Sequence, residues 1–206
     1  MKASAFLMSL LLIVGASSAQ ATIVATDATF GSFDASSGTR TLTVSTHGTI
    51  NDVNVLLEFA KCDNPSIGAQ GQACIGGGTA FNNEIVFQLT KGSTTVNLIN
   101  AGTYGVGGAG IGRIMLVIDD EASSAVGGTL AAGTFSGVGA LSAFDGMDMF
   151  GSWTLFIQDT TGADQLDYFS SALDINGGGQ VPEPGSLALL GLALLGLGAA
   201  RRKAAL

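Results

Sequence analysis

The chain has 206 residues, a formal net charge of −8 and a mean hydropathy of +0.46. Its central part, residues 22–175, carries 4 basic and 15 acidic side chains, which gives this part a net charge of −11. Such a surface repels nucleic acid and anionic lipid headgroups, so the charge excludes a nucleic-acid-binding function. It suits divalent cations, although net charge also serves solubility alone. This part is long enough for one domain with its own core.

The chain begins with MKASAFLMSLLLIVGASSAQA, in which Lys2 precedes an apolar stretch and small residues lead up to Ala21. This order is typical of a secretory signal peptide that is cleaved after Ala21. The alternative is a buried or membrane-spanning helix, but an apolar run of about ten residues is too short to cross a bilayer. We therefore expect an exported protein and assign residues 1–21 to the signal peptide.

The only two cysteines, Cys62 and Cys74, lie in the segment CDNPSIGAQGQAC. An exported chain meets an oxidising compartment, which favours a disulfide between two cysteines this close together. Two cysteines without a nearby histidine or a second pair do not form a metal site. We therefore predict a structural disulfide that closes this loop.

Residues 22–175 show apolar side chains with a period of two, which indicates β-strands with one buried face. Thr90-Lys91-Gly92-Ser93 predicts a hairpin turn, and the apolar run 113–118 predicts a strand covered on both faces. The predicted strands are 40–46, 50–60, 84–89, 94–99, 113–118, a short one near Leu130, one containing Trp153, Leu155 and Ile157, and 168–175. Strands of this number and spacing predict an all-β fold, an antiparallel two-sheet β-sandwich.

Residues suited to catalysis are sparse in this sequence. The single histidine, His47, lies near a turn, and the motifs of zinc peptidases and serine hydrolases do not occur. We therefore predict no enzymatic activity. The alternative is a glycan hydrolase that uses two carboxylates, although pairs of acids arise by chance in a chain with this many.

Calcium is the one cofactor that the sequence suggests, because Ca²⁺ takes about six to eight oxygen ligands from carboxylates and carbonyls. Asp and Asn also favour turns by bonding their own backbone, and the spacing does not match an EF-hand loop. Both interpretations stay open at this stage. The candidate ligands are Asp119, Asp120, Glu121, Asp145 and Asp159.

Two segments, LVIDDEA at 116–122 and LSAFDGMDMFGSWTLFIQDTTGADQLDYFSSALDI at 141–175, carry a family resemblance. Together with the strands from residue 50 onward, they resemble the P-domain (P/Homo B) of subtilisin-like proprotein convertases. The resemblance implies a jelly-roll β-sandwich that assists a protease without catalysing the reaction, sometimes with bound calcium. The hairpin lacks the proline of that family, the cysteine loop looks like an insertion, and no protease domain precedes the sandwich.

The chain ends with the linker NGGGQ at 176–180 and the segment VPEPGSLALLGLALLGLGAARRKAAL at 181–206. As a helix, the apolar run 186–200 spans about 22 Å, against roughly 30 Å of hydrocarbon, and the basic cluster after it stays cytoplasmic. The segment resembles the PEP-CTERM sorting signal, which implies a transmembrane helix, recognition by an exosortase and cleavage near the Pro-Glu-Pro. The alternative is a single-span anchor that is never cleaved. The signal residues are Val181, Pro182, Glu183, Pro184, Arg201, Arg202 and Lys203.

These features predict an exported protein that is transiently anchored in the inner membrane and then resides at the cell surface or outside the cell. Its sandwich is expected to be a binding or structural module. The resemblance of the tail to the PEP-CTERM sorting signal implies a role in exopolysaccharide and biofilm formation. The alternative function is an accessory module for a separate secreted subtilisin-like protease.

Overall fold

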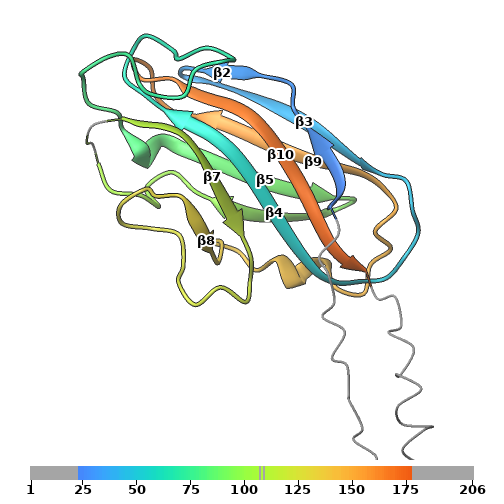
Figure 1. Ribbon diagram of the computed structural model, residues 1–206. Helices are drawn as coiled ribbons and strands as arrows, with labels where there is room; N and C mark the ends of the chain where they lie inside the picture. Colours follow the sequence, from blue (N-terminus) through green and yellow to red (C-terminus); the bar gives the residue numbers. More distant parts are fainter. Residues whose placement is uncertain (1–22, 107, 109, 178–206) are drawn as a thin grey trace, which may run out of the picture. The chain divides into compact units, whose positions relative to one another are not determined.

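Alternating apolar and polar side chains fold the described part of the chain into ten strands and two short 3-10 helices (Figure 1). The computed structural model describes residues 23–106, 108 and 110–177. The predicted signal peptide and sorting segment, and all but the first two residues of the linker, lie outside this range. The elements are β1 (Ile23–Asp27), β2 (Gly31–Phe33), β3 (Ser36–Val44), β4 (Ile50–Lys61), η1 (Asn82–Glu84), β5 (Ile85–Lys91), β6 (Thr94–Ile99), β7 (Ile111–Ile118), β8 (Gly133–Phe135), η2 (Leu141–Phe144), β9 (Gly151–Asp159) and β10 (Leu166–Gly177).

The strands form two sheets, which confirms the predicted all-β fold. The first sheet, here called sheet A, has the order β1-β10-β4-β7-β8, and β2 pairs with the end of β10. The second sheet has the order β3-β9-β5-β6. Without the short β2 and β8, the orders β1-β10-β4-β7 and β3-β9-β5-β6 are those of a jelly roll. The pairing of β7 with β8 is parallel, so the sheet is not antiparallel throughout.

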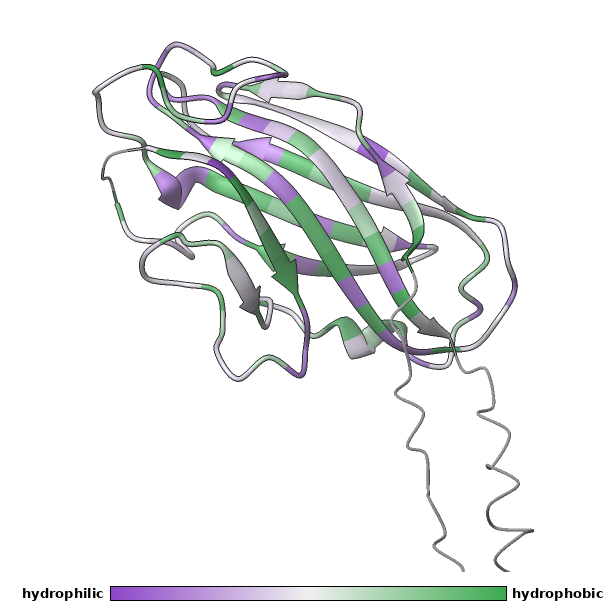
Figure 2. Ribbon diagram, in the orientation of Figure 1, coloured by the Kyte–Doolittle hydropathy of each residue, from purple (hydrophilic) through white to green (hydrophobic). Residues whose placement is uncertain are grey.

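The core lies between the two sheets, where the strands present every second side chain. Along β9, Trp153, Leu155 and Ile157 are fully buried, and the Trp153 ring meets the Phe144 ring edge-on with 4.9 Å between centroids. Figure 2 shows the corresponding alternation of hydrophobic and hydrophilic residues along the strands. Burial of each large apolar side chain stabilises the fold by about 1.5–3 kcal/mol. The core face predicted for residues 50–60 is confirmed, since Val53, Val55, Leu57 and Phe59 are all buried.

The prediction that β7 is covered on both faces is wrong. Leu116 and Ile118 point into the core, but Met115 is 52% exposed on the other face of the strand. Arg113 also lies partly exposed on that face. The outer face of sheet A is therefore open to solvent along β7, and the apolar run misled because Met115 and Val117, which lie on that face, do not need full burial.

The sandwich has two distinct ends. Ile23 of β1 pairs with Asp174 of β10, and Gly177 of β10 pairs with Ile50 of β4, so the first described strand begins where the last one ends. We call this the terminal end. Lys61, at the other end of β4, lies about 36 Å away along the strand, at what we call the distal end. None of the helices in the described part of the chain is long and apolar enough to cross a membrane.

Candidate functional site

The cysteine loop between β4 and η1 folds back over the distal end of sheet A. Cys62 and Cys74 form a disulfide with their Cα atoms 5.4 Å apart. The fully buried carboxylate of Asp167 on β10 accepts hydrogen bonds from Ser66 Oγ at 2.8 Å and from the Ile67 N–H at 2.9 Å. Cys62 and Ile67 pack with Phe169 in a small hydrophobic cluster of their own. The loop is thus fastened to the sheet by a covalent, a polar and an apolar contact.

The same loop also runs against the start of β7. The Arg113 N–H donates a hydrogen bond to the carbonyl oxygen of Gln72 at 2.8 Å. A side chain at Gly112 would place its Cβ 2.3 Å from that oxygen, and one at Gly110 would place it 2.7 Å from the Cys74 sulfur. Glycine at both positions therefore allows the loop to approach the strand this closely.

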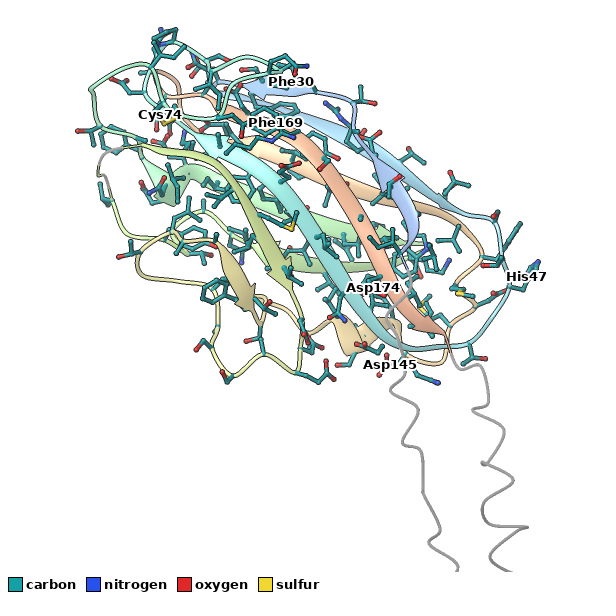
Figure 3. The ribbon with its side chains drawn as sticks, in the orientation of Figure 1. Phe30, His47, Cys74, Asp145, Phe169 and Asp174 are labelled. Atoms are coloured by element: carbon teal, nitrogen blue, oxygen red, sulfur yellow. A yellow bond between two sulfur atoms is a disulfide. The ribbon has the colours of Figure 1, made fainter. Side chains whose placement is uncertain are left out.

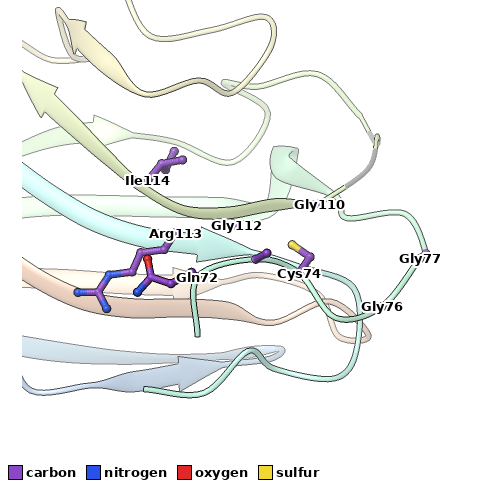
Figure 4. A pocket seen from close by; sticks show the side chains of 10 residues that line it. Gln72, Cys74, Gly76, Gly77, Gly110, Gly112, Arg113 and Ile114 are labelled. Carbon is purple, nitrogen blue, oxygen red and sulfur yellow. The ribbon is translucent and has the colours of Figure 1, made fainter. Parts of the chain in front are cut away.

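Three adjoining hollows cross the outer face of sheet A, and we call them together the sheet groove. The hollow between the cysteine loop and β7 has a volume of about 540 Å³ (Figure 4). Arg113 separates it from a hollow of about 370 Å³, and Glu58 and Ser170 separate that one from a third of about 220 Å³. The groove runs from the distal end toward Met115 and Ile23.

A fixed ion pair lies at the centre of the sheet groove. Arg113 donates from Nε and Nη2 to the two carboxylate oxygens of Glu58, at 2.7 and 2.9 Å, and Ser170 Oγ donates to the same carboxylate at 2.8 Å. The hydrogen bond from Arg113 lowers the pKa of Glu58, and the one to Glu58 raises the pKa of Arg113. Both side chains therefore stay charged at neutral pH, and the fork geometry holds them in one orientation.

Two aromatic rings lie next to the Glu58–Arg113 ion pair. The Arg113 guanidinium lies 4.3 Å from the centroid of the buried Phe169 ring, and the half-buried Phe30 ring lies 5.6 Å from Phe169. Figure 3 shows Phe30, Phe169 and Cys74 gathered at the distal end. The exposed Gln70 side chain completes the wall opposite β4. The groove thus offers planar hydrogen-bonding groups beside an apolar surface.

A second polar cluster is buried beneath the distal end. Lys61 and Asp159 are fully buried, and the Lys61 Nζ lies 2.6 Å from Asp159 Oδ2, 2.9 Å from Asp164 Oδ2 and 3.5 Å from Glu84 Oε2. Asp164 also accepts hydrogen bonds from the Phe81 N–H, through its carboxylate, and from Lys61, through its carbonyl. Burial raises the pKa of Asp159 to about 6 and raises that of Glu84 as well.

The structure separates Asp159 from the other four predicted calcium ligands. Asp159 lies at the distal end in contact with Lys61. Asp120 accepts a hydrogen bond from the Ser142 N–H of η2 at 2.8 Å, and Asp145 directly follows η2 near Ile50, toward the terminal end. Asp119 and Glu121 share a turn beside Asp120, in which the Glu121 N–H donates to Asp119 Oδ1 at 2.8 Å.

No group of three or more His, Cys, Asp or Glu side chains in the described part of the chain forms a set that could hold a metal ion. The five candidates thus do not fit a single calcium site. Their turn-forming hydrogen bonds favour the other interpretation of these acids. Calcium binding stays a prediction.

Sequence reasoning missed both polar centres. Glu58 and Arg113 are 55 positions apart, and Lys61 and Asp159 are 98 apart, so no local spacing reveals either pair. One signal was available for the second. Lys61 is one of only four basic residues in the sandwich, and it ends a strand that is otherwise largely apolar.

Comparison with known proteins identifies the end of the chain. Residues 180–203 match the PEP-CTERM protein-sorting motif. The motif implies export and membrane-associated sorting by an exosortase, and it includes every predicted signal residue from Val181 to Lys203. These residues lie outside the described part of the structure. No curated protein and no solved structure matches the chain, so the P-domain resemblance rests on the sequence alone.

Proposed function

We propose that this protein is sorted by an exosortase to the cell surface or the extracellular matrix, where its sandwich binds an extracellular polysaccharide without catalysing a reaction. The PEP-CTERM motif at residues 180–203 supports the route. The sheet groove carries the proposal for the ligand, because it is long, open and lined by fixed polar groups beside aromatic rings.

The chemistry of the groove suits a sugar polymer. Hydroxyl groups on a sugar ring match the N–H donors that Arg113 does not use on Glu58 and the remaining lone pairs of the Glu58 carboxylate, while the apolar faces of the ring suit Phe30 and Met115. Three hollows in a row fit a chain of rings better than a single small molecule. The net charge of −11 on the central part of the chain favours a neutral or cationic polymer over an anionic one.

The position of the groove agrees with surface display. The last described residue before the sorting segment, residue 177, lies at the terminal end, whereas the largest of the three hollows of the groove lies at the distal end. A polymer bound there contacts the end of the sandwich from which neither described terminus leaves.

The test uses the exposed glutamines of the groove, because they can be shortened without breaking the Glu58–Arg113 pair. The double substitution Gln70→Ala and Gln72→Ala is expected to weaken binding of a neutral extracellular polysaccharide from the producing culture by about tenfold, or about 1.4 kcal/mol. Asp145→Asn, a change of an exposed acid that lines none of the three hollows, serves as the control and should bind like the unchanged protein. Affinity electrophoresis measures both.

Two outcomes would contradict the proposal. Equal retardation of the groove variant and the control would remove the groove as the binding surface. Release of reducing ends from the polysaccharide by the purified protein would show that the sandwich is an enzyme.

The second candidate is an accessory module for a secreted subtilisin-like protease. Its support is the P-domain resemblance of residues 50–175, together with a strand order that is compatible with the jelly roll this resemblance implies. Crosslinking in the exporting cells tests it, since a protease recovered with the sandwich would favour this candidate over the polysaccharide.

A further inference from the structure

Lys61 occupies an unusual position for a lysine in a secreted domain. Its side chain is fully buried, as is that of Asp159, and Asp164 and Glu84 are buried around them. The other buried lysine, Lys91, differs, because its Nζ faces the carbonyl oxygens of Phe150 and Met149 at 2.8 and 3.3 Å. Of the two lysines in the described part of the chain, Lys61 is therefore the one whose amine meets carboxyl groups.

Burying the Lys61 amine and its three carboxyl neighbours as separate ions costs free energy. Three carboxyl groups surround one amine, so full ionisation leaves two uncompensated negative charges away from water. Asp164 Oδ1 is buried and has no hydrogen-bond partner among the described residues. Converting one amine and one carboxylate into a neutral amide removes two buried charges at once.

We propose that Lys61 and Asp159 join in an intramolecular isopeptide bond. A bond forms between Lys61 Nζ and Asp159 Cγ, and a C–O bond of the Asp159 carboxyl group breaks. An ammonium and a carboxylate together yield an amide and one water molecule, so the reaction needs no oxidant, reductant or other reactant. The geometry carries this proposal, because Nζ already lies 2.6 Å from Asp159 Oδ2.

Formation of the amide is favoured because the two reacting groups are close together and buried away from water. Well-oriented groups within one molecule react as if present at about 10⁵–10⁸ M, which offsets the preference of free amines and acids for hydrolysis in water. Burial raises the pKa of Asp159, which favours the neutral acid, and the neutral acid is the form that an amine attacks.

Glu84 is placed to move the protons. Its Oε2 lies 3.5 Å from Lys61 Nζ, close enough to take a proton from the ammonium and return it to the oxygen that leaves as water. Asp164 has a positioning role, because its carboxylate is shared with the Phe81 N–H and its carbonyl holds the Lys61 amine.

The bond would link β4 of sheet A to β9 of the other sheet at the distal end. Lys61 directly precedes Cys62, so two covalent links would lie side by side, one across the sandwich and one within the loop. A protein displayed outside the cell gains resistance to unfolding from both, since each restricts the unfolded chain. This inference does not depend on the nature of the ligand in the sheet groove.

Peptide mapping of the full chain from exporting cells tests the proposal directly. Trypsin cleaves after free lysines, so the reduced and denatured protein is expected to be cut after Lys91 and left uncut after Lys61. Mass spectrometry should then find a branched peptide that contains Lys61 and Asp159 and is lighter by one water molecule than its two parts. Cleavage after Lys91 in the same digest is the internal control.

Variants separate the roles of Lys61 and Glu84. Lys61→Arg should abolish the branched peptide, and Glu84→Gln should reduce its yield at least tenfold. Complete cleavage after Lys61 in the unchanged protein would overturn the proposal and leave an ion pair, whether or not the variants fold. A branch at Asp164 or Glu84 would overturn the choice of Asp159, and an unchanged yield in Glu84→Gln would overturn the proton transfer.

Discussion

Asp148 shows how one side chain can shape a corner at the terminal end. Its Oδ1 accepts hydrogen bonds from the N–H groups of Gly48 and Phe150, each at 3.1 Å, and its Oδ2 lies 2.6 Å from His47 Nδ1. The His47 ring stacks on Phe150 with 4.1 Å between the centroids. The hydrogen bond to His47 is the main reason why the pKa of Asp148 falls from 3.8 to about 2. The residue therefore acts in the corner as an acceptor.

The pH dependence of stability should reveal this role. A lowered pKa means that the folded protein binds fewer protons than the unfolded chain between about pH 2 and 4, so Asp148 stabilises the fold above this window and loses that effect below it. We predict that Asp148→Asn lowers the melting temperature by a few degrees at pH 7, and that the difference from the unchanged protein shrinks between pH 4 and 2.

Thermal melts followed by circular dichroism measure this difference, with Asp145→Asn as the control for loss of an exposed acid in the same segment. A difference that stays constant down to pH 2 would contradict the assigned role.

At the scale of single residues, the sequence predicts the local setting of a side chain better than the residue that it contacts. His47 was correctly placed near a turn, but its partner is 101 positions away. Asp159 was considered a calcium ligand or a turn former, and the structure places it against Lys61. Such contacts depend on how the strands are paired, and the local pattern of one strand contains no information about its neighbours.

Whole strands can be predicted from the sequence where one face of the strand is exposed to solvent and the other is buried. Strands β4, β5, β6, β9 and β10 were predicted because their alternation has a period of two. Strands β1 and β2 were missed because they are short and partly polar, and only their pairing with β10 defines them. The sheet groove was also beyond prediction, since it needs the four strands β1, β4, β7 and β10 and the cysteine loop together.

The cysteine loop is the element whose stability can be tested most directly. The disulfide closes a loop with a sequence separation of 12, and restricting an unfolded chain over such a distance stabilises a fold by about 3 kcal/mol. We predict that the double substitution Cys62→Ser and Cys74→Ser lowers the free energy of unfolding by about this amount in denaturant titrations.

Reduction of the unchanged protein is the matched control for this prediction, because it opens the same loop without changing a side chain. The two measurements should agree. Two reactive thiols in the exported, unreduced protein would show that the disulfide does not form.

Considered as a whole, the molecule divides its tasks between its two ends. The terminal end holds the first described residue of β1 and the last of β10, so the segments before and after the sandwich connect there. The distal end holds the disulfide loop, the buried Lys61 cluster and the largest hollow of the groove. This division follows from a jelly roll in which β1 and β10 are neighbours, and no single segment of the sequence predicts it.

The sorting segment should therefore be separable from the sandwich. The matched motif implies exosortase processing. We predict that the unchanged protein starts at Thr22 and ends near Pro184, with the apolar run and its basic cluster removed. Replacing Pro182, Glu183 and Pro184 with alanine should keep most of the protein in the membrane fraction with Leu206 as its last residue. Ser186→Ala, a change in the same tail outside the Pro-Glu-Pro, should be processed normally, and mass spectrometry of both termini measures all three proteins. An unchanged protein that still ends at Leu206 would contradict this prediction and favour the permanent single-span anchor. The apolar run, which spans about 22 Å as a helix, would then have to remain in roughly 30 Å of hydrocarbon.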